Sequence, residues 1–194
     1  MAVDDRRERE RVARRRLIVA TARAVAEAEG WDAVTTRRLS TEIEYSQPVL
    51  YKHFTGMNDI ADAVAIDGFG ELASALGAAH AKSEAGGDAL SRIAHAYLDF
   101  ARQIPAVYDA MFIRATGLRF AAEDTPPELE AAFAEVRRGV GEVAADRDVD
   151  ALTEVFWAAL HGLVTLSRAG RLRPGHDAER IRLLVDGFAD RQRT

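Results

Sequence analysis

Apolar residues recur at helical spacing along most of the chain, and no segment alternates in the manner of a strand with clustered β-branched residues. The pattern predicts an all-α fold of about nine helices. The expected helices cover residues 4–29, 36–43, 46–54, 57–82, 90–104, 105–115, 127–143, 155–166 and 181–188. Gly30 is expected to end the first helix, because glycine is common just past a helix end.

Two apolar faces carry most of the structural prediction. In the first helix, Leu17, Thr21, Ala24 and Ala28 form one stripe, with Ile18, Ala22 and Val25 beside it. The segment 155–166 is apolar nearly all round, so it is expected to be buried on all sides. Its second partner surface is most simply the same helix of another subunit, which predicts a homodimer, and Gly162 would permit close approach. The expected interface consists of Phe156, Leu160, Leu163, Val164, Ile181, Leu184 and Phe188.

Composition narrows the class of protein. The 194 residues are 48% apolar and 29% charged, which is an ordinary balance for a globular protein. The chain has no cysteine, which excludes disulfides and thiolate zinc sites. No apolar signal segment follows the N-terminal arginines, and residues 155–166 fall short of the roughly 20 residues that a membrane span needs. We therefore expect a cytoplasmic protein that does not enter a membrane.

Charge is distributed unevenly along the chain. Residues 1–54 contain 11 basic and 9 acidic side chains, whereas residues 55–194 contain 15 basic and 22 acidic ones. The N-terminal part is thus locally positive, with an arginine-rich run over residues 6–16. A phosphate-binding surface depends on such local potential. A solvated helix start with interleaved acids explains the run equally well.

Two short helices joined by a short turn, after a long helix, form a candidate helix-turn-helix motif. Residues 46–54 would be the helix that enters the major groove. Gln47 can pair with adenine, Val49 can pack on a thymine methyl group, and Thr36 at a helix start can meet a phosphate. The expected DNA contacts are Arg14, Thr36, Arg37, Ser46, Gln47, Val49, Tyr51, Lys52 and His53. Leu50 and Phe54 should point to the core, although core packing alone could also explain the Tyr-x-His-Phe pattern.

These residues resemble the TetR family of bacterial transcription regulators from Leu17 to Ile60. The match includes Gly30-Trp31-Asp32, the helix start Val34-Thr35-Thr36-Arg37 and the helix end Leu50-Tyr51-Lys52-His53-Phe54. Residues 156–163 also look like the Trp-x-x-x-His-Gly stretch of one TetR subgroup. The resemblance implies an N-terminal helix-turn-helix domain, residues 1–56, that binds a double-stranded DNA operator. It also implies a helical domain, residues 57–194, that binds a small effector and forms a homodimer through its last two long helices.

Three positions depart from the family pattern. The turn that usually holds a glycine has Glu44, which costs on the order of 1 kcal/mol or rearranges the turn. Ser40 replaces a residue that is most often alanine, and Met57 replaces a frequent lysine, which removes one phosphate contact. One hypothesis is that Arg11, Arg14, Arg15 and Arg16 compensate by contacting phosphate or an adjacent minor groove.

The effector side is less defined. Aromatic residues and methionine at helical spacing are usually core residues, but within a TetR-like domain some should line a ligand cavity. The candidate pocket residues are Tyr97, Phe100, Tyr108, Met111, Phe112, Trp157 and His161, and their character favours a mainly hydrophobic effector. His161 is either a buried histidine with a neighbouring partner or a polar anchor in that pocket.

The leading hypothesis is a repressor that a small effector releases from its operator. The alternatives are a helical ligand-binding or interaction protein without DNA binding, and an enzyme that uses the central cavity. The five histidines show no metal-ligand spacing, and no nucleophile elbow or phosphate loop occurs. We therefore expect no catalytic residues, no metal and no cofactor.

Overall fold

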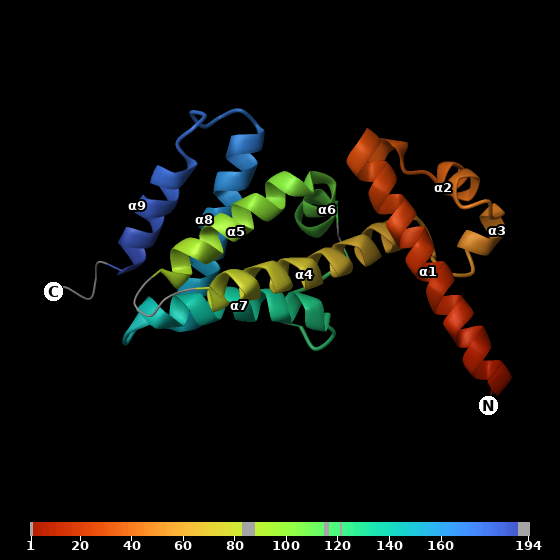
Figure 1. The fold of residues 1–194 in the computed structure, drawn as a ribbon, viewed down its shortest axis with the longest axis horizontal. Coiled ribbons are helices and arrows are strands. Elements are labelled where there is room, and N and C mark those ends of the chain that lie inside the picture. Colours follow the sequence, from red (N-terminus) through yellow and green to blue (C-terminus); the bar gives the residue numbers. More distant parts are fainter. Residues whose placement is uncertain (1, 83–87, 115–116, 121, 190–194) are drawn as a thin grey trace. The chain divides into compact units, whose positions relative to one another are not determined.

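The computed structural model describes residues 2–82, 88–114, 117–120 and 122–189, and within these ranges it confirms the all-α fold. The nine α-helices of the described residues are α1 Ala2–Glu29, α2 Thr36–Glu42, α3 Gln47–Leu50, α4 Met57–Ala81, α5 Ala89–Gln103, α6 Pro105–Asp109, α7 Pro127–Ala144, α8 Val149–Arg168 and α9 Asp177–Ala189 (Figure 1). Two short elements accompany them, a 3₁₀-helix η1 at Trp31–Ala33 and a π-helix η2 at Ala110–Arg114.

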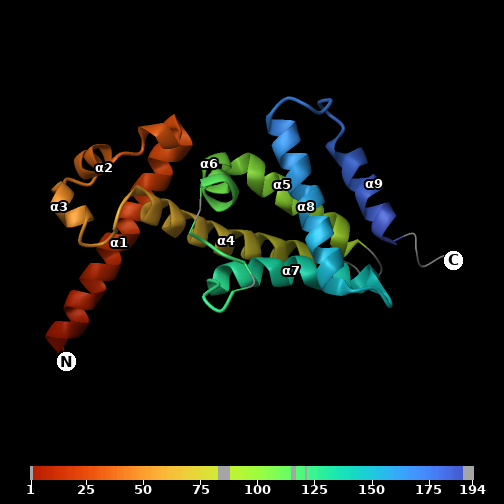
Figure 2. The same cartoon turned by 180° about the vertical axis from the view of Figure 1, so that it is seen from behind.

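The helices group into two compact units. One unit comprises residues 1–68 and 104–126, and the other comprises residues 69–103 and 127–194. The first unit is larger than the expected DNA-binding domain, because it also contains residues 57–68 and the segment with α6 and η2. Figure 2 shows the same helices from behind.

In the first unit, α1 buries only part of its expected apolar face, the part that contains Ile18, Ala22 and Val25. Ile18 and Ala22 are fully buried and Val25 is nearly so, whereas Leu17 is 43% exposed. Ala24 and Ala28, which belong to the stripe of Leu17, are also exposed. Ile18 and Val25 bury more apolar surface than Ala24 and Ala28 would in their place. Gly30 ends the helix as expected, with a φ of 85°.

The segment from α2 to α3 has the geometry of a helix-turn-helix. Thr35 begins α2, and its side chain accepts a hydrogen bond from the backbone N–H of Arg38 at 3.1 Å. Glu44 in the turn has a φ of 57°, so the left-handed conformation is kept although the residue is not glycine. Ser46 precedes α3, its hydroxyl accepts no capping hydrogen bond, and Pro48 lies in the first turn of the helix.

A polar joint fixes α6 to the end of α1. The carboxylate of Glu27 accepts hydrogen bonds from the backbone N–H groups of Ala106 at 3.2 Å and Val107 at 2.9 Å, which are orphan donors at the start of α6. Trp31 donates its Nε1–H to the carbonyl of Ala106 at 2.8 Å in a buried position. These hydrogen bonds therefore give a partner to three N–H groups, those of the Ala106 and Val107 backbone and of the Trp31 side chain, that would otherwise lack one.

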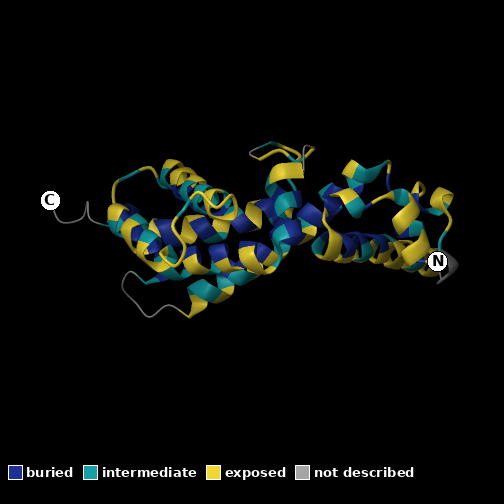
Figure 3. Cartoon of the chain, turned by 90° about the horizontal axis from the view of Figure 1, so that it is seen from above, coloured by how far each residue is buried: buried dark blue, intermediate teal, exposed yellow. Residues whose placement is uncertain are grey.

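In the second unit, α5, α7, α8 and α9 pack around one apolar core. The buried faces of α5 and α8 include Tyr97, Phe156 and Leu160, each with no exposed surface. Phe188 of α9 packs edge-on against Phe156, with ring centroids 5.1 Å apart. Figure 3 shows buried residues along the sides of the helices that face their neighbours. The amphipathic pattern of the sequence thus describes this unit well.

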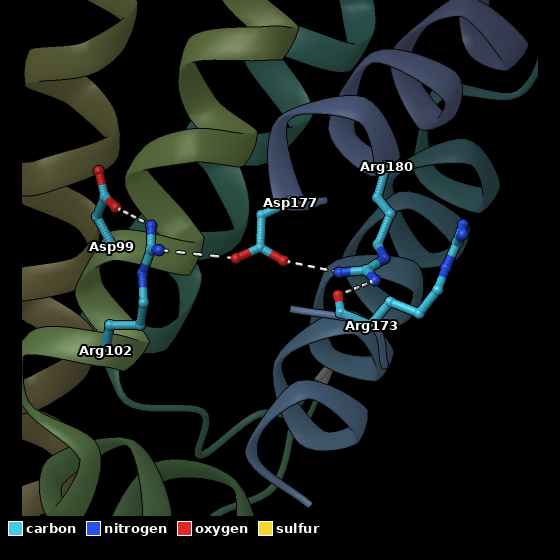
Figure 4. Close-up of polar contacts among 5 residues, drawn as sticks. All are labelled: Asp99, Arg102, Arg173, Asp177 and Arg180. Atoms are coloured by element: carbon cyan, nitrogen blue, oxygen red, sulfur yellow. Dashed lines mark hydrogen bonds and ion pairs between the residues drawn. The ribbon is translucent and has the colours of Figure 1, made fainter. Parts of the chain in front are cut away.

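Two arginines fasten α9 to this core. Figure 4 shows Asp177 at the start of α9 between Arg102 of α5, at 3.7 Å, and Arg180, at 2.9 Å. Arg180 in turn donates to the backbone carbonyl of Arg173 in the preceding loop. Near the other end, Arg147 donates to the carbonyl of Phe188 at 2.6 Å and to carbonyls at the end of α7. The start of α9 is therefore tied to α5 by an ion pair and to the preceding loop by a hydrogen bond, and its end is tied by a hydrogen bond to Arg147.

Helix α8 is longer than the apolar stretch that predicted it. Among the described residues it is the one helix that is long and apolar enough to cross a membrane, with a mean hydropathy of 1.3 over its best window. A core helix of a soluble protein can be equally long and apolar, and α8 contacts α5 and α7. One such helix does not indicate a membrane protein.

The strained turn gives a direct stability test. A left-handed conformation costs a non-glycine residue about 1–2 kcal/mol, and part of the gain from glycine is lost to the entropy of the unfolded chain. We expect Glu44→Gly to raise the free energy of unfolding by about 0.5–1 kcal/mol and Glu44→Val to lower it, as measured by urea denaturation. Equal stabilities for the two variants would contradict the left-handed turn.

Candidate functional site

The segment around α3 has one exposed side and one buried side. Ser46, Gln47 and Lys52 are exposed, and the ring of Tyr51 is 56% exposed. Leu50 and Phe54 are buried at 1% and 3% exposure, as the sequence predicted. The polar residues that can meet base edges or phosphate therefore share one surface, while the two apolar residues fix that surface to the unit.

The remaining predicted DNA contacts lie around this surface. Val49 and Thr36 are partly exposed, and Arg37 is exposed on α2. Arg14 of α1 has a half-exposed side chain that lies 3.7 Å from Glu10. These residues are accessible for contact with a ligand, and their assignment to DNA stays a prediction.

Arg15 is the residue of this site that the sequence interpretation misplaced. It was grouped with arginines that contact phosphate, but its Nη1 donates to the backbone carbonyl of His53 at 3.0 Å. Its guanidinium carbon also lies 4.2 Å from the ring centroid of Phe54, within cation–π range. Arg15 therefore braces the end of the α3 segment against α1. The signal in the sequence is weak, since an arginine between two others carries no mark of its role.

His53 is shielded by the same brace. Burial lowers the pKa of His53 from its ordinary value, and the positive charges of Arg14, Arg11, Arg15 and Lys52 lower it further. Its Nδ1 is buried without a hydrogen-bond partner among the described residues. The lowered pKa favours the uncharged imidazole of His53.

The predicted effector residues divide between the two units. In the second unit, Trp157 donates its Nε1–H to the hydroxyl of the buried Tyr97 at 3.0 Å and tilts against Phe133 at 5.6 Å. His161 is half-buried, and burial lowers its pKa. Phe100 is buried at 7% exposure. The structure therefore brings Tyr97 and Trp157 together in one polar contact inside an apolar region.

The other three predicted effector residues belong to the first unit. Tyr108 is fully buried and tilts against Phe112 at 4.7 Å between ring centroids. Met111 lies against Gly68, where a Cβ would come within 2.9 Å of its sulfur. Close approach of α4 to the α6–η2 segment therefore depends on the absence of a side chain at Gly68. Tyr108 and Met111 act as core residues in this unit.

The predicted dimer residues lie mostly inside a single chain. Phe156, Leu160, Val164, Ile181 and Phe188 are all at most 9% exposed. Leu163 and Leu184 are partly exposed. Large apolar residues are exposed at other positions of the same helices, with Val155 at 59%, Leu166 at 42% and Leu183 at 57%. Within one chain only one side of α8 faces the core, so the burial of residues 155–166 on all sides, which requires a second subunit, stays a prediction.

The contacts of Arg15 predict that its substitution lowers the stability of the protein. Arg15→Met removes a charge-assisted hydrogen bond and a cation–π contact, so we expect the free energy of unfolding to fall by about 1–2 kcal/mol. Arg16→Met is the control, because Arg16 is the exposed neighbour. Urea denaturation of both variants measures the difference. Equal stability of the two variants would show that Arg15 does not brace α3.

Family models match both parts of the chain. Residues 18–64 match the model described as bacterial regulatory proteins of the tetR family, and residues 90–188 match the model described as a tetracyclin repressor-like C-terminal domain. An uncharacterized HTH-type transcriptional regulator of Mycobacterium tuberculosis is 32% identical over 165 residues, which are 80% of this chain and 71% of that protein.

Solved structures give the same fold. A protein with unknown function from Rhodococcus sp. RHA1 is 27% identical with a TM-score of 0.75, and the match covers 91% of this chain and 93% of that one. The regulator FadR from Bacillus subtilis, solved in complex with stearoyl-CoA, is 12% identical with a TM-score of 0.66 and coverage of 88% and 97%. The helix-turn-helix geometry and the two family matches lead to one conclusion: the chain belongs to the TetR family and is a DNA-binding transcriptional regulator.

Proposed function

We propose that the protein is a homodimeric cytoplasmic repressor that leaves its operator when a small hydrophobic effector binds. The exposed polar side of residues 46–52, with Leu50 and Phe54 buried beneath it, is the observation that carries the DNA-binding part. In this proposal residues 1–56 bind DNA and residues 57–194 bind the effector and the second subunit. Gln47 reads a base edge in the major groove, while Thr36, Arg37, Tyr51 and Lys52 position the unit on phosphates.

The buried position of most expected interface residues moves the proposed dimer surface to the other side of α8. Val155, Ala159, Gly162 and Leu166 are spaced by four, three and four residues, so they share one face of the helix. Gly162 has open space where a Cβ would be, which leaves room for a neighbouring helix. Leu183 adds an exposed apolar side chain on α9. A dimer places two α3 segments at half-sites about one helical turn, roughly 34 Å, apart.

Release of the operator requires only a modest coupling free energy between effector binding and DNA binding. A ligand that binds better when the two α3 segments have another separation weakens operator binding, and a coupling of about 1–3 kcal/mol is sufficient. The apolar surroundings of Trp157 and Tyr97 support a hydrophobic effector with one polar group. The stearoyl-CoA complex of the Bacillus subtilis FadR, which has the same fold, suggests acyl-CoA thioesters as the first probes.

DNA reading is tested by selection from a library of random duplexes, followed by footprinting of the selected sequence. We expect a two-fold symmetric site, and we expect Gln47→Ala to weaken binding to it by about 1–3 kcal/mol while relaxing the preference at one base pair per half-site. Binding of Gln47→Ala to unselected duplex should stay unchanged. Enrichment of no sequence would contradict the proposal, and failure of stearoyl-CoA and shorter acyl-CoAs to release the selected duplex would remove this effector class.

The proposed dimer surface is tested by charge insertion. Leu166→Glu places a carboxylate on the apolar face, at its C-terminal end, so we expect the variant to elute as a monomer in gel filtration with light scattering, because an unpaired buried charge is costly. Arg171→Glu, at an exposed position in the following loop, is the control and should remain dimeric. A dimeric Leu166→Glu protein would exclude this face.

A further inference from the structure

The N-terminal half of α1 has no role in the core of its unit. Helix α1 starts at Ala2, and from residue 5 on, where the side chains are described, the first buried residue is Ile18. Figure 1 shows the helix continuing past α2 and α3 toward the N-terminus. Residues 2–14 alone correspond to about 20 Å of helix. We call this segment the helical arm.

The helical arm is maintained by ion pairs instead of apolar packing. Arg6 pairs with Glu10 at 2.9 Å, and Arg11 pairs with Glu8 at 2.7 Å, at helical spacing on a surface that is largely exposed. Such pairs support a helix by about 0.2–0.5 kcal/mol each. A polar helix that contacts nothing else is stable only with such pairs or with a partner.

The arginines of the helical arm project from different sides of the helix. Arg7, Arg11 and Arg14 are spaced by four and three residues, and the same spacing continues to the buried residues Ile18 and Ala22. These arginines therefore project from the side of α1 that faces the helix-turn-helix. Arg6 and Arg9 project from other sides of the arm, which makes them suitable controls.

The side of the arm that carries Arg7, Arg11 and Arg14 lies next to the end of the α3 segment. Arg15, one turn further along, donates to the carbonyl of His53. Arg11 and Arg14 are near enough to His53 for their charges to act on its imidazole. The arginines on this side of the arm are thus adjacent to the exposed polar surface that contains Gln47 and Lys52. A partner that binds this surface also contacts the arm.

We infer that residues 2–14 form a helical arm that binds the phosphate backbone of duplex DNA beside the base pairs contacted by α3, through Arg7, Arg11 and Arg14. The inference rests on the proposed DNA-binding function and extends its contact surface. Phosphate competes with Glu8 for Arg11 at little cost, because exposed ion pairs contribute only about 0–1 kcal/mol. The exposed apolar residues of this region, Val12 and Leu17, are five positions apart and form no face for a helix of another protein.

The test measures binding of the full chain to a fluorescein-labelled 40-base-pair duplex of arbitrary sequence between about 50 and 200 mM salt. Each lost phosphate contact lowers the slope of log K against log salt concentration by about 0.9. We expect Arg7→Gln/Arg11→Gln to lower the slope by about 1–2 per subunit and to weaken binding about five- to thirtyfold at 0.15 M salt.

The control is Arg6→Gln/Arg9→Gln, which removes the same charge from the same arm. Each double variant removes one arginine that forms an ion pair, Arg11 with Glu8 or Arg6 with Glu10, and one arginine outside these two pairs, so the loss of helix stability should be similar. Circular dichroism checks this similarity. We expect the control to change the slope by less than about 0.3, because groups that do not contact phosphate release few counterions.

A variant in the opposite direction separates contact from unfolding. Glu8→Gln frees Arg11 from its ion pair, so it should tighten duplex binding more than Asp5→Asn does. Equal effects of the two double variants, or no effect of either, would overturn the helical arm. If the wild-type chain binds no duplex at all, the proposed function itself fails. If binding to a selected site still depends on Gln47 while the arm variants bind as the wild type does, only the proposal of the helical arm fails.

Discussion

The contact of Arg15 with the end of the α3 segment is the interaction on which the DNA-binding geometry depends. Helix α3 has only four residues in helical conformation, too few for its own hydrogen bonds to fix its direction. Leu50 and Phe54 anchor it by burial, and Arg15 holds the carbonyl of His53 and covers the ring of Phe54. A base-reading side chain is specific only when its backbone is held in place, so a residue that need not touch DNA sets the precision of those that do.

Helix α1 serves several functions along its length because different stretches of it have different neighbours. Its middle part contributes the buried face to the three-helix core. Its end carries Glu27, which together with Trp31 of η1 binds the start of α6. Any displacement of α6 must break these hydrogen bonds or carry α1 along, and α1 in turn holds α3 through Arg15. A rigid helix with a partner at each site is therefore a physical route between α6 and the DNA-binding surface.

The fold could be predicted from the sequence because helical periodicity and turn residues are local signals. The order of the helices and the positions of Leu50 and Phe54 in the core follow from such signals. The left-handed turn at Glu44 has no such signal, because the residue is not glycine. The choice between Ile18 and Leu17 as the inward residue, in contrast, depends on the volume of neighbouring helices. The role of Arg15 could not be predicted, because its partner is a backbone carbonyl 38 residues away, and a carbonyl has no signature in the sequence.

The same limit explains the dimer residues. A segment that is apolar nearly all round indicates two partner surfaces, but it does not say which side belongs to which partner. In α8 the large residues Phe156 and Leu160 fill the core of the chain, where they bury the most surface per residue. Smaller residues such as Ala159 and Gly162 are left on the opposite side with Val155 and Leu166. Small residues permit two helix backbones to approach closely, so a side built from them is suited to a symmetric helix contact, in which each residue meets its own copy or a near neighbour.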